Sequence, residues 1–224
     1  MNQPKNNRIL SALTSQVYAN LNKHFELVPL ALGELLVDAN REIEFLHFPI
    51  KGIVSLISVM QDGSTTEVGL IGKEGMTGIP QFLGNGVSNN RSVVQLKGTA
   101  IKISAEVLRV EFERNLSLQK LLLDYNLKLF NQVSQCASCN NHHSVKQRAA
   151  RWLLMLDDRV DGELLTMTQQ LLSQMLGVRR SGVSEVASEI QQQGIINYSR
   201  GNITILDREA LESIACECYL FLQE

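Results

Sequence analysis

The chain has 224 residues, a formal net charge of −2 and a globular composition of 44% hydrophobic and 20% charged residues, which excludes a disordered, fibrous or generally basic DNA-coating protein. No apolar run approaches the roughly 18 residues that a membrane helix needs, and the polar start Met1–Arg8 lacks the apolar core of a signal peptide. We therefore expect a cytoplasmic protein with one large or two small domains and no membrane partner.

The first half of the chain predicts a short helix followed by many strands. A helical stretch at Ser11–His24 precedes apolar and β-branched clusters that are short and separated by turn residues. Asp62–Gly63 lies between two clusters and indicates a hairpin, because glycine readily adopts positive φ. Many short strands at near-regular spacing favour a small antiparallel barrel or sandwich. The expected strands are Phe25–Val28, Glu34–Val37, Ile43–Phe48, Ile53–Met60, Thr65–Ile71 and Val93–Ile103.

From Ala105 onward the pattern becomes helical. We expect a short helix at Glu106–Arg114, with Ser104 as its N-cap, and a long helix from Leu116 to about Asn141 that contains no Gly or Pro. The long helix has two apolar stripes, which indicates that one face packs on its own domain while the other contacts a partner. The alternative is a core helix buried on two sides in a monomer. One stripe is a heptad seam of Leu118, Leu122, Tyr125, Leu129, Gln132, Cys136 and Cys139, and the other consists of Leu123, Leu127, Phe130 and Ala137.

Gln132 is the polar position within the heptad seam, and such a residue can fix the register of a helix pair. This interpretation assigns the seam to the contact between two copies of the chain.

The region after Ser144 predicts three helices and a hairpin. Two of the helices surround Gly177, and an apolar residue, Val178, directly follows this glycine. Two helices around such a turn are typical of a helix-turn-helix. The hairpin that follows is the wing of a winged helix. The expected elements are an amphipathic helix from Val145 to Leu156, a helix capped by Thr168 and ended by Gly177, a helix Arg180–Gln193 closed by Gly194, and a hairpin Ile195–Leu206 with its turn at Ser199–Asn202.

A helix-turn-helix of this kind places the N-terminal part of its second helix in the major groove of DNA. Arginine there can bind guanine O6 and N7 with two hydrogen bonds, glutamate can accept from a cytosine amino group, and serine is a weaker reader. Thr168 and Gln170 of the first helix can hold phosphate oxygens, and Arg200 at the wing tip is placed for another. The outward positions at the start of the second helix are Arg179, Arg180, Ser181, Ser184 and Glu185.

The charge of this region predicts moderate affinity for DNA. From Val145 to Glu224 there are 8 Lys and Arg against 11 Asp and Glu, a net charge of −3, whereas phosphate neutralisation supplies much of the affinity of most DNA-binding domains. Between Gly177 and Asn202, three Arg against two Glu leave a net charge of +1. A dimer doubles these cations, so we expect binding that relies on shape and base contacts.

The order of a small barrel, a long helix and a C-terminal winged helix resembles the Crp/Fnr family of bacterial transcription regulators over nearly the whole chain. The most specific part is Leu176–Glu185, which matches the family's recognition segment, and Phe48–Leu56 looks like the family's barrel. The resemblance implies an α+β fold with a cyclic-nucleotide-binding-like barrel (jelly roll) at residues 1–115, a dimerisation helix at 116–142 and a winged helix-turn-helix at 143–224.

The resemblance also assigns roles within the recognition segment. It implies that Arg180, Ser181 and Glu185 read bases, and that Arg179 and Gly182 touch the DNA backbone. Family members often have Glu and then Arg where this chain has Ser181 and Glu185. The operator half-site should therefore differ from the commonest family sequence.

The candidate effector pocket departs from the family pattern. Members that bind cyclic nucleotides have a Gly-Glu pair, with Glu on the ribose hydroxyl, and a later Arg-Ser/Thr-Ala, with Arg on the cyclic phosphate. Here Gly75 is followed by Met76, which cannot accept a hydrogen bond from a ribose hydroxyl, while Arg91 and Ser92 match the second part. We therefore expect control by something other than cAMP. The alternatives are another small ligand, or a pocket that holds nothing, with Arg91 in a structural salt bridge.

The four cysteines suggest a metal or redox site less strongly than they suggest ordinary buried thiols. Cys136 and Cys139 lie one helical turn apart and could face one ion, but they also fit the seam as small apolar residues. Cys216 and Cys218, if helical, point in different directions. Iron–sulfur sensors of the resembled family use cysteines near the N-terminus, where this chain has none. We expect no cofactor and no metal, with Cys136 and Cys139 as the alternative site.

The sequence thus predicts a homodimeric regulator that binds a palindromic operator on double-stranded DNA and contacts RNA polymerase, with an unknown effector that acts on the hinge near Asn140–Ser144. It contains no GxxxxGK[ST], GxSxG or HExxH motif, so we expect no enzyme. The alternative function is a degenerate cyclic-nucleotide-domain module that acts through protein–protein interaction without reading DNA.

Overall fold

The computed structural model describes residues 3–160 and 165–222. By its internal contacts the chain forms two compact units, of which the first comprises Met1–Ser58 and Gly69–Phe130 and the second comprises Val59–Val68 and Asn131–Glu224. None of the described helices is both long and apolar enough to cross a bilayer.

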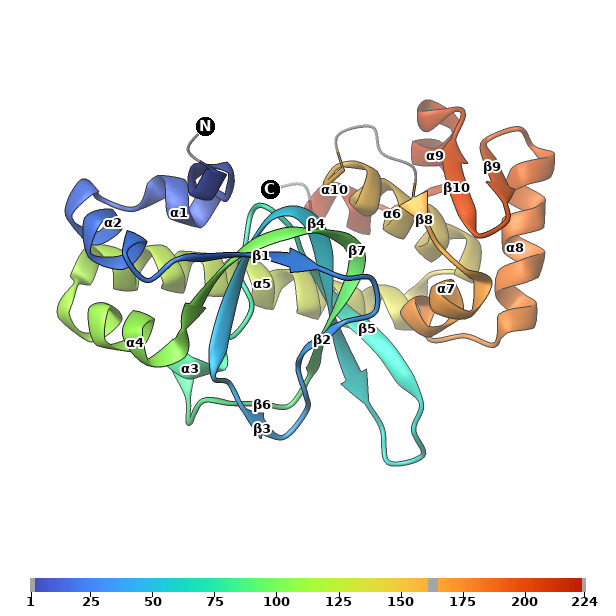
Figure 1. Cartoon of the computed structure of the whole chain (residues 1–224). Coiled ribbons are helices and arrows are strands. Elements are labelled where there is room, and N and C mark those ends of the chain that lie inside the picture. The colour runs from blue at the N-terminus through green and yellow to red at the C-terminus, as the bar shows by residue number, and fades with distance from the viewer. Residues whose placement is uncertain (1–2, 161–164, 223–224) are drawn as a thin grey trace. The chain divides into compact units, whose positions relative to one another are not determined.

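The N-terminal half contains an antiparallel sheet (Figure 1) with the strand order β1-β7-β4-β5. Strand β2 also pairs with β7. A separate two-stranded ladder joins β3 to β6. These pairings do not close on themselves among the described strands, so the expected barrel is not a closed one. The strands are β1 (Glu26–Leu30), β2 (Leu35–Val37), β3 (Arg41–Glu42), β4 (Phe45–Val59), β5 (Thr65–Ile71), β6 (Val87–Ser88) and β7 (Arg91–Ser104).

The expected strands Ile43–Phe48 and Ile53–Met60 form one strand, β4, because the residues between them bend the strand without ending it. The pairing of β4 with β7 shifts register between Pro49 and Val54. Gly52 has a φ of 88° and lies against the backbone of Leu96 and Gly98, where a Cβ would clash. Glycine therefore permits a bulge here, which the alternating pattern on either side does not reveal.

The N-terminal helical stretch is two helices, since Leu13 is extended and Thr14 begins a second helix by accepting a hydrogen bond from Val17 N. These helices pack with β4, β7, α4 and α5 in one apolar core. Asn7 is buried there; its side chain caps α1 and donates to the carbonyls of Pro49 and Gly75. The helices of this half are the 3-10 helix η1 (Gln3–Asn6), α1 (Arg8–Ala12), α2 (Ser15–Asn22), α3 (Pro80–Leu83), α4 (Ala105–Arg114) and α5 (Leu116–His142).

The long helix α5 buries the heptad seam within its own chain. Leu118, Leu122 and Tyr125 lie in the core of the first unit, and Gln132 is only 9% exposed. The assignment of this seam to a partner, with Gln132 as a register residue, is therefore wrong. The two stripes are offset by two residues, which is about 200° around a helix, so burial of one stripe turns the other outward. That exposed stripe contains Leu116, Leu123, Leu127 and Phe130.

The second unit contains the predicted winged helix. The first of its helices, α6, begins at Ser144, where a reciprocal capping box with Gln147 satisfies the helix start. Trp152 of α6 is buried and donates to the Glu67 carboxylate at 2.6 Å, within the same unit. The elements after α5 are α6 (Val145–Asp157), β8 (Leu165–Thr166), α7 (Gln169–Leu176), α8 (Arg180–Gln192), β9 (Ile196–Ser199), β10 (Asn202–Ile205), α9 (Arg208–Ile214) and α10 (Cys218–Phe221).

Candidate nucleic-acid interface

The turn between α7 and α8 has the geometry that the sequence predicts. Thr168 caps α7 by accepting from Leu171 N at 3.1 Å. Gly177 ends α7 in the left-handed conformation, with φ 62° and ψ 36°, and its N–H and that of Val178 bond back to carbonyls of α7. This arrangement redirects the chain within two residues and begins α8 at Arg180. Leu172, Leu176, Val183 and Ile190 are buried between the helices.

The N-terminal part of α8 presents unpaired polar groups. Arg179, Arg180, Ser181 and Glu185 are exposed. In the part of the chain that the structure describes, neither arginine forms an ion pair or hydrogen bond through its side chain. Both guanidinium groups are therefore available for a ligand outside the chain. Ser188, which the sequence reasoning missed, is also exposed and lies one heptad after Ser181 on the same face; the helical spacing alone would have revealed it.

Ser184 and Gly182 occupy different surroundings from the residues beside them. The Ser184 hydroxyl donates to Gln169 Oε1 at 2.9 Å and also lies 3.1 Å from the carbonyl of Arg180, so it connects α8 to α7. A Cβ at Gly182 would meet no atom within 4 Å. The fold therefore does not need a glycine at position 182, and the backbone there is open to close approach by another molecule.

The wing is a three-stranded sheet in the order β8-β10-β9. Arg200 and Gly201 form its two-residue turn, with φ of 49° and 77°, as a type I′ hairpin requires. Tyr198 anchors the wing, since its hydroxyl donates to the carbonyl of Met167 at 2.9 Å and its N–H to Gln191 Oε1. Arg200 is exposed at the tip, Thr168 and Gln170 are exposed at the start of α7, and Figure 1 shows the wing beside α8.

Several acidic residues of the C-terminal region form ion pairs. Lys146 pairs with Glu189 at 2.7 Å and thereby neutralises one of the two glutamates of α8. Arg208 on α9 pairs with Asp157, Asp158 and Glu212. The start of α8 has Arg179 and Arg180 exposed beside Glu185, so it is locally basic although the region as a whole has a net charge of −3.

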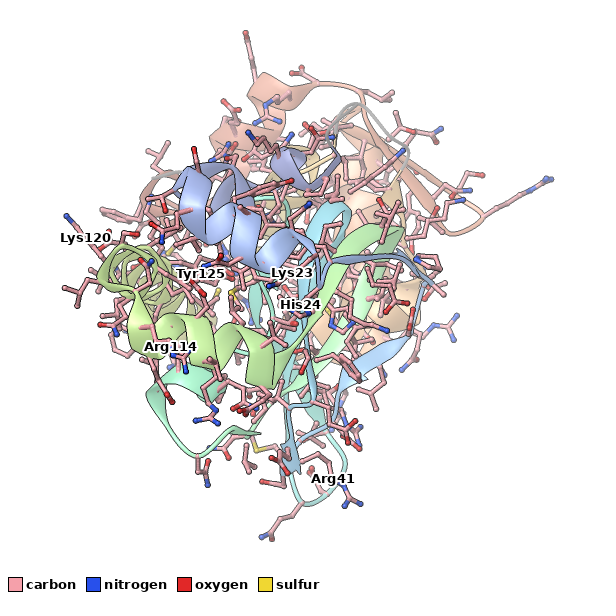
Figure 2. The ribbon with its side chains drawn as sticks, turned by 60° about the vertical axis from the view of Figure 1, so that its left-hand side comes forward. Lys23, His24, Arg41, Arg114, Lys120 and Tyr125 are labelled. Atoms are coloured by element: carbon pink, nitrogen blue, oxygen red, sulfur yellow. The ribbon has the colours of Figure 1, made fainter. Side chains whose placement is uncertain are left out.

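The residues of the candidate effector pocket are held by contacts within the first unit. Met76 is fully buried in the apolar core, and its carbonyl accepts from the Tyr125 hydroxyl at 3.0 Å. A Cβ at Gly75 would overlap the Tyr125 ring; Tyr125, labelled in Figure 2, comes from α5. Ser92 is buried. Arg91 donates to Asp38 at 2.7 Å, and this bond holds the pKa of the Asp38 carboxyl below its usual value.

The cysteines do not group as the sequence led us to expect. Cys136 lies beside Arg151, whose Nη1 is 3.4 Å from its sulfur, and burial raises the pKa of the Cys136 thiol. Cys139 instead lies 3.5 Å from Cys216. Cys216 precedes α10 and is not helical, so Cys216 and Cys218 both join the cluster of Cys139. The alternative site of Cys136 with Cys139 is therefore not the grouping in the structure, and Cys216 and Cys218 come together because Cys216 is not helical.

Comparison with known proteins agrees with this geometry. Residues 147–214 match the Crp-like helix-turn-helix domain, and no curated protein sequence matches the chain. The fold is similar to that of FixK2 from Bradyrhizobium japonicum, with a TM-score of 0.73 at 15% identity over 86% of this chain and 98% of FixK2. It is also similar to a CRP/FNR family transcriptional regulator from Thermus thermophilus, with a TM-score of 0.68 at 19% identity over 85% of this chain and 98% of that one.

A third similar structure is the c-di-GMP responsive global regulator CLP of Xanthomonas campestris, with a TM-score of 0.68 at 17% identity over 86% of this chain and 99% of CLP. The chain therefore contains a Crp-like helix-turn-helix domain and has the fold of the Crp/Fnr transcription regulators.

Proposed function

We propose that this protein is a sequence-specific transcription regulator that binds a palindromic operator as a homodimer. The main support is the start of α8, where Arg179 and Arg180 are exposed, unpaired within the described residues and directly follow the left-handed turn at Gly177. An arginine at the N-terminal end of a recognition helix can bind guanine through two hydrogen bonds. Arg180, Ser181 and Glu185 read bases in this proposal, while Arg179 and the open backbone at Gly182 contact phosphates.

Thr168, Gln170 and Arg200 contact phosphates on either side of the recognition helix in this proposal. Ser184 acts differently from our expectation, since its hydroxyl bonds to Gln169 and fixes α8 against α7. It contributes to DNA reading by orienting the helix.

A second copy of the chain is the proposed partner of the exposed stripe on α5. Leu116, Leu123, Leu127 and Phe130 are 81%, 47%, 58% and 64% exposed, which is unusual for large apolar side chains arranged along one helix face. Their spacing of 7, 4 and 3 residues is a heptad pattern, the pattern by which two helices pair. Lys120, labelled in Figure 2, falls within this stripe and is exposed.

The regulator we propose is not an enzyme and is controlled by something other than cAMP. Met76 offers no acceptor for a ribose hydroxyl, its side chain is buried in the core, and Arg91 is paired with Asp38. As a DNA-binding regulator it would work in the bacterial cytoplasm with RNA polymerase as a partner. The N-terminal domain (1–115) then serves as sensor or scaffold, 116–142 as dimerisation helix and 143–224 as DNA-binding domain.

Gel-shift titration of purified protein against genomic fragments over a salt series tests this function. Sequence-specific binding should appear as a subset of fragments that stay bound when rising salt removes the others, because phosphate contacts are few. Addition of cAMP should leave these complexes unchanged. Uniform weak binding to all fragments, lost together as salt rises, would contradict the proposal and favour a protein-interaction module instead.

A further inference from the structure

Four side chains of the second unit converge at a point that DNA binding does not use. Cys139 lies in the last turn of α5 and His143 directly follows that helix, while Cys216 precedes α10 and Cys218 is its first residue. One ligand atom from each residue lies within 4.8 Å of all the others. The Cys139 and Cys216 sulfurs are 3.5 Å apart, and the Cys218 sulfur is 3.6 Å from His143 Nδ1. We propose that these three cysteines and one histidine bind a single thiophilic divalent cation, Zn²⁺.

The size and composition of the cluster fit one tetrahedral ion. With Zn–S bonds of about 2.3 Å, the sulfurs of a tetrahedral site lie roughly 3.8 Å apart, so the four groups need to move only slightly to reach ideal geometry. Three thiolates and one imidazole are a common ligand set for structural zinc. An iron–sulfur cluster spreads its ligands over several irons and requires wider spacing than this cluster has.

Groups around the cluster hold its ligands in place. His143 directs Nδ1 at Cys218, and its Nε2 lies 3.2 Å from the Glu217 carboxylate. A metal-bound histidine usually donates its other N–H to such a carboxylate, which fixes the tautomer and the ring. Gln135 donates to the Cys218 sulfur at 3.0 Å.

Two buried arginines lie beside the end of α5: Arg148 donates to Asn140 Oδ1 at 3.1 Å, and Arg151 contacts the Cys136 sulfur. Arg148 and Arg151 are 8% and 4% exposed, and Nε of each has no hydrogen-bond partner. Neither forms an ion pair with a carboxylate in residues 3–160 and 165–222. A buried cation without a counter-charge is costly. Zn²⁺ with three thiolates and a neutral histidine has a net charge of −1, which offsets this cost.

The site would join the end of α5 to the C-terminal segment, next to the residue at which α6 begins. Metal binding would therefore hold together the segment at Asn140–Ser144 that leads into the helix-turn-helix domain. The proposal concerns the metal site itself and does not depend on whether the protein binds DNA.

Elemental analysis of the full chain, purified under reducing conditions without chelator, tests the proposal. We expect one zinc per chain, and Co²⁺ in its place should give the absorption of a tetrahedral thiolate complex. Cys139→Ser and Cys216→Ser should each weaken zinc binding at least tenfold in competition with a chromogenic chelator. Glu217→Gln should weaken it about tenfold or more, as for other residues that orient a ligand.

Cys136→Ser is the matched control, because Cys136 is also buried on the same helix but contacts Arg151 instead of the cluster. This variant should keep one zinc per chain. His143→Cys, which preserves a four-ligand set, should retain the metal where His143→Ala loses it, so loss of binding is distinguished from misfolding. Failure of the reduced wild-type chain to bind added Zn²⁺ or Co²⁺, or an equal loss in Cys136→Ser and Cys139→Ser, would overturn the proposal.

Discussion

Arg180 is the residue on which base reading most depends. Because its guanidinium has no partner within the described chain, Arg180→Ala should leave folding intact and weaken binding to the preferred operator by about 1–3 kcal/mol. Fluorescence anisotropy with operator and scrambled duplexes measures this loss. Arg114→Ala, at an exposed arginine at the end of α4 (Figure 2), is the control. Equal loss on both duplexes would assign Arg180 to phosphate contact.

A substitution at Gly182 should affect folding and DNA binding in opposite directions. Its surroundings have room for a Cβ, and alanine favours a helix over glycine by up to about 1 kcal/mol. Gly182→Ala should therefore raise the free energy of unfolding slightly while it weakens DNA binding, because the methyl group obstructs the phosphate backbone. Urea denaturation and anisotropy measure the two effects. Unchanged DNA affinity would show that the backbone does not approach the duplex here.

His47 predicts a pH dependence of stability in the N-terminal unit. Burial lowers its pKa from 6.5 to about 4, and its Nδ1 has no hydrogen-bond partner among the described residues. Between these values the unfolded chain binds a proton that the folded chain does not. The free energy of unfolding is therefore not reduced by His47 above pH 6.5. It decreases as pH falls from 6.5 toward 4, by about 3 kcal/mol in total.

Urea denaturation at pH 7, 5.5 and 4.5 measures this dependence. His47→Gln should flatten the decline in stability, whereas His24→Gln, at an exposed position (Figure 2), should follow the wild type. Parallel pH profiles of the wild type and His47→Gln would contradict the burial of a neutral imidazole.

At the scale of elements, the exposed stripe of α5 determines the proposed assembly. Leu127 is 58% exposed in the single chain, so Leu127→Glu should change the free energy of unfolding of that chain by less than about 0.5 kcal/mol. In a helix pair the same change buries a charge, and we expect sedimentation to show monomers at micromolar concentration. Lys23→Glu, at an exposed position outside α5, should leave the dimer intact. A wild-type chain that sediments as a monomer would contradict the assembly.

Some elements of the fold could be predicted from local sequence patterns, and others could not. Gly177, Thr168 and the Ser199–Asn202 turn were predictable because each follows local chemistry: a left-handed cap, a side-chain cap and a hairpin that needs positive φ. The continuity of β4 across Pro49–Gly52 was not predictable, since the bulge depends on pairing with β7. The two α5 stripes were visible, but which one is buried depends on residues such as Met76 that are distant in sequence.

The cysteine cluster illustrates the same limit for the candidate sites. Its two halves, Cys139 with His143 and Cys216 with Cys218, are separated by more than 70 residues along the chain, and only the fold shows that Cys216 and Cys218 approach the end of α5. The spacing of Cys139 and His143 by four residues was a usable sign, because such residues face the same side of a helix. Cys136 lies one turn before Cys139 and has a similar sequence signal, but in the structure it contacts Arg151 instead of the cluster.

At the scale of the whole molecule, the net charge argues against DNA binding, whereas the helix-turn-helix fold argues for it. The C-terminal region has a net charge of −3, yet the start of α8 is locally basic because Arg179 and Arg180 are exposed there beside Glu185. Net charge governs long-range attraction to DNA, whereas base contacts govern discrimination. We therefore expect a regulator whose affinity is moderate and whose specificity is carried by a few side chains.

Enrichment of random duplexes on the purified full chain measures that specificity most directly. We predict a selected motif of two inverted half-sites whose centres lie about one helical turn, roughly 10 base pairs, apart. The half-sites should be lost or relaxed when Arg180→Ala is used for the selection. No enrichment by the wild-type protein, or a single half-site without its inverted copy, would contradict a dimeric, sequence-specific regulator.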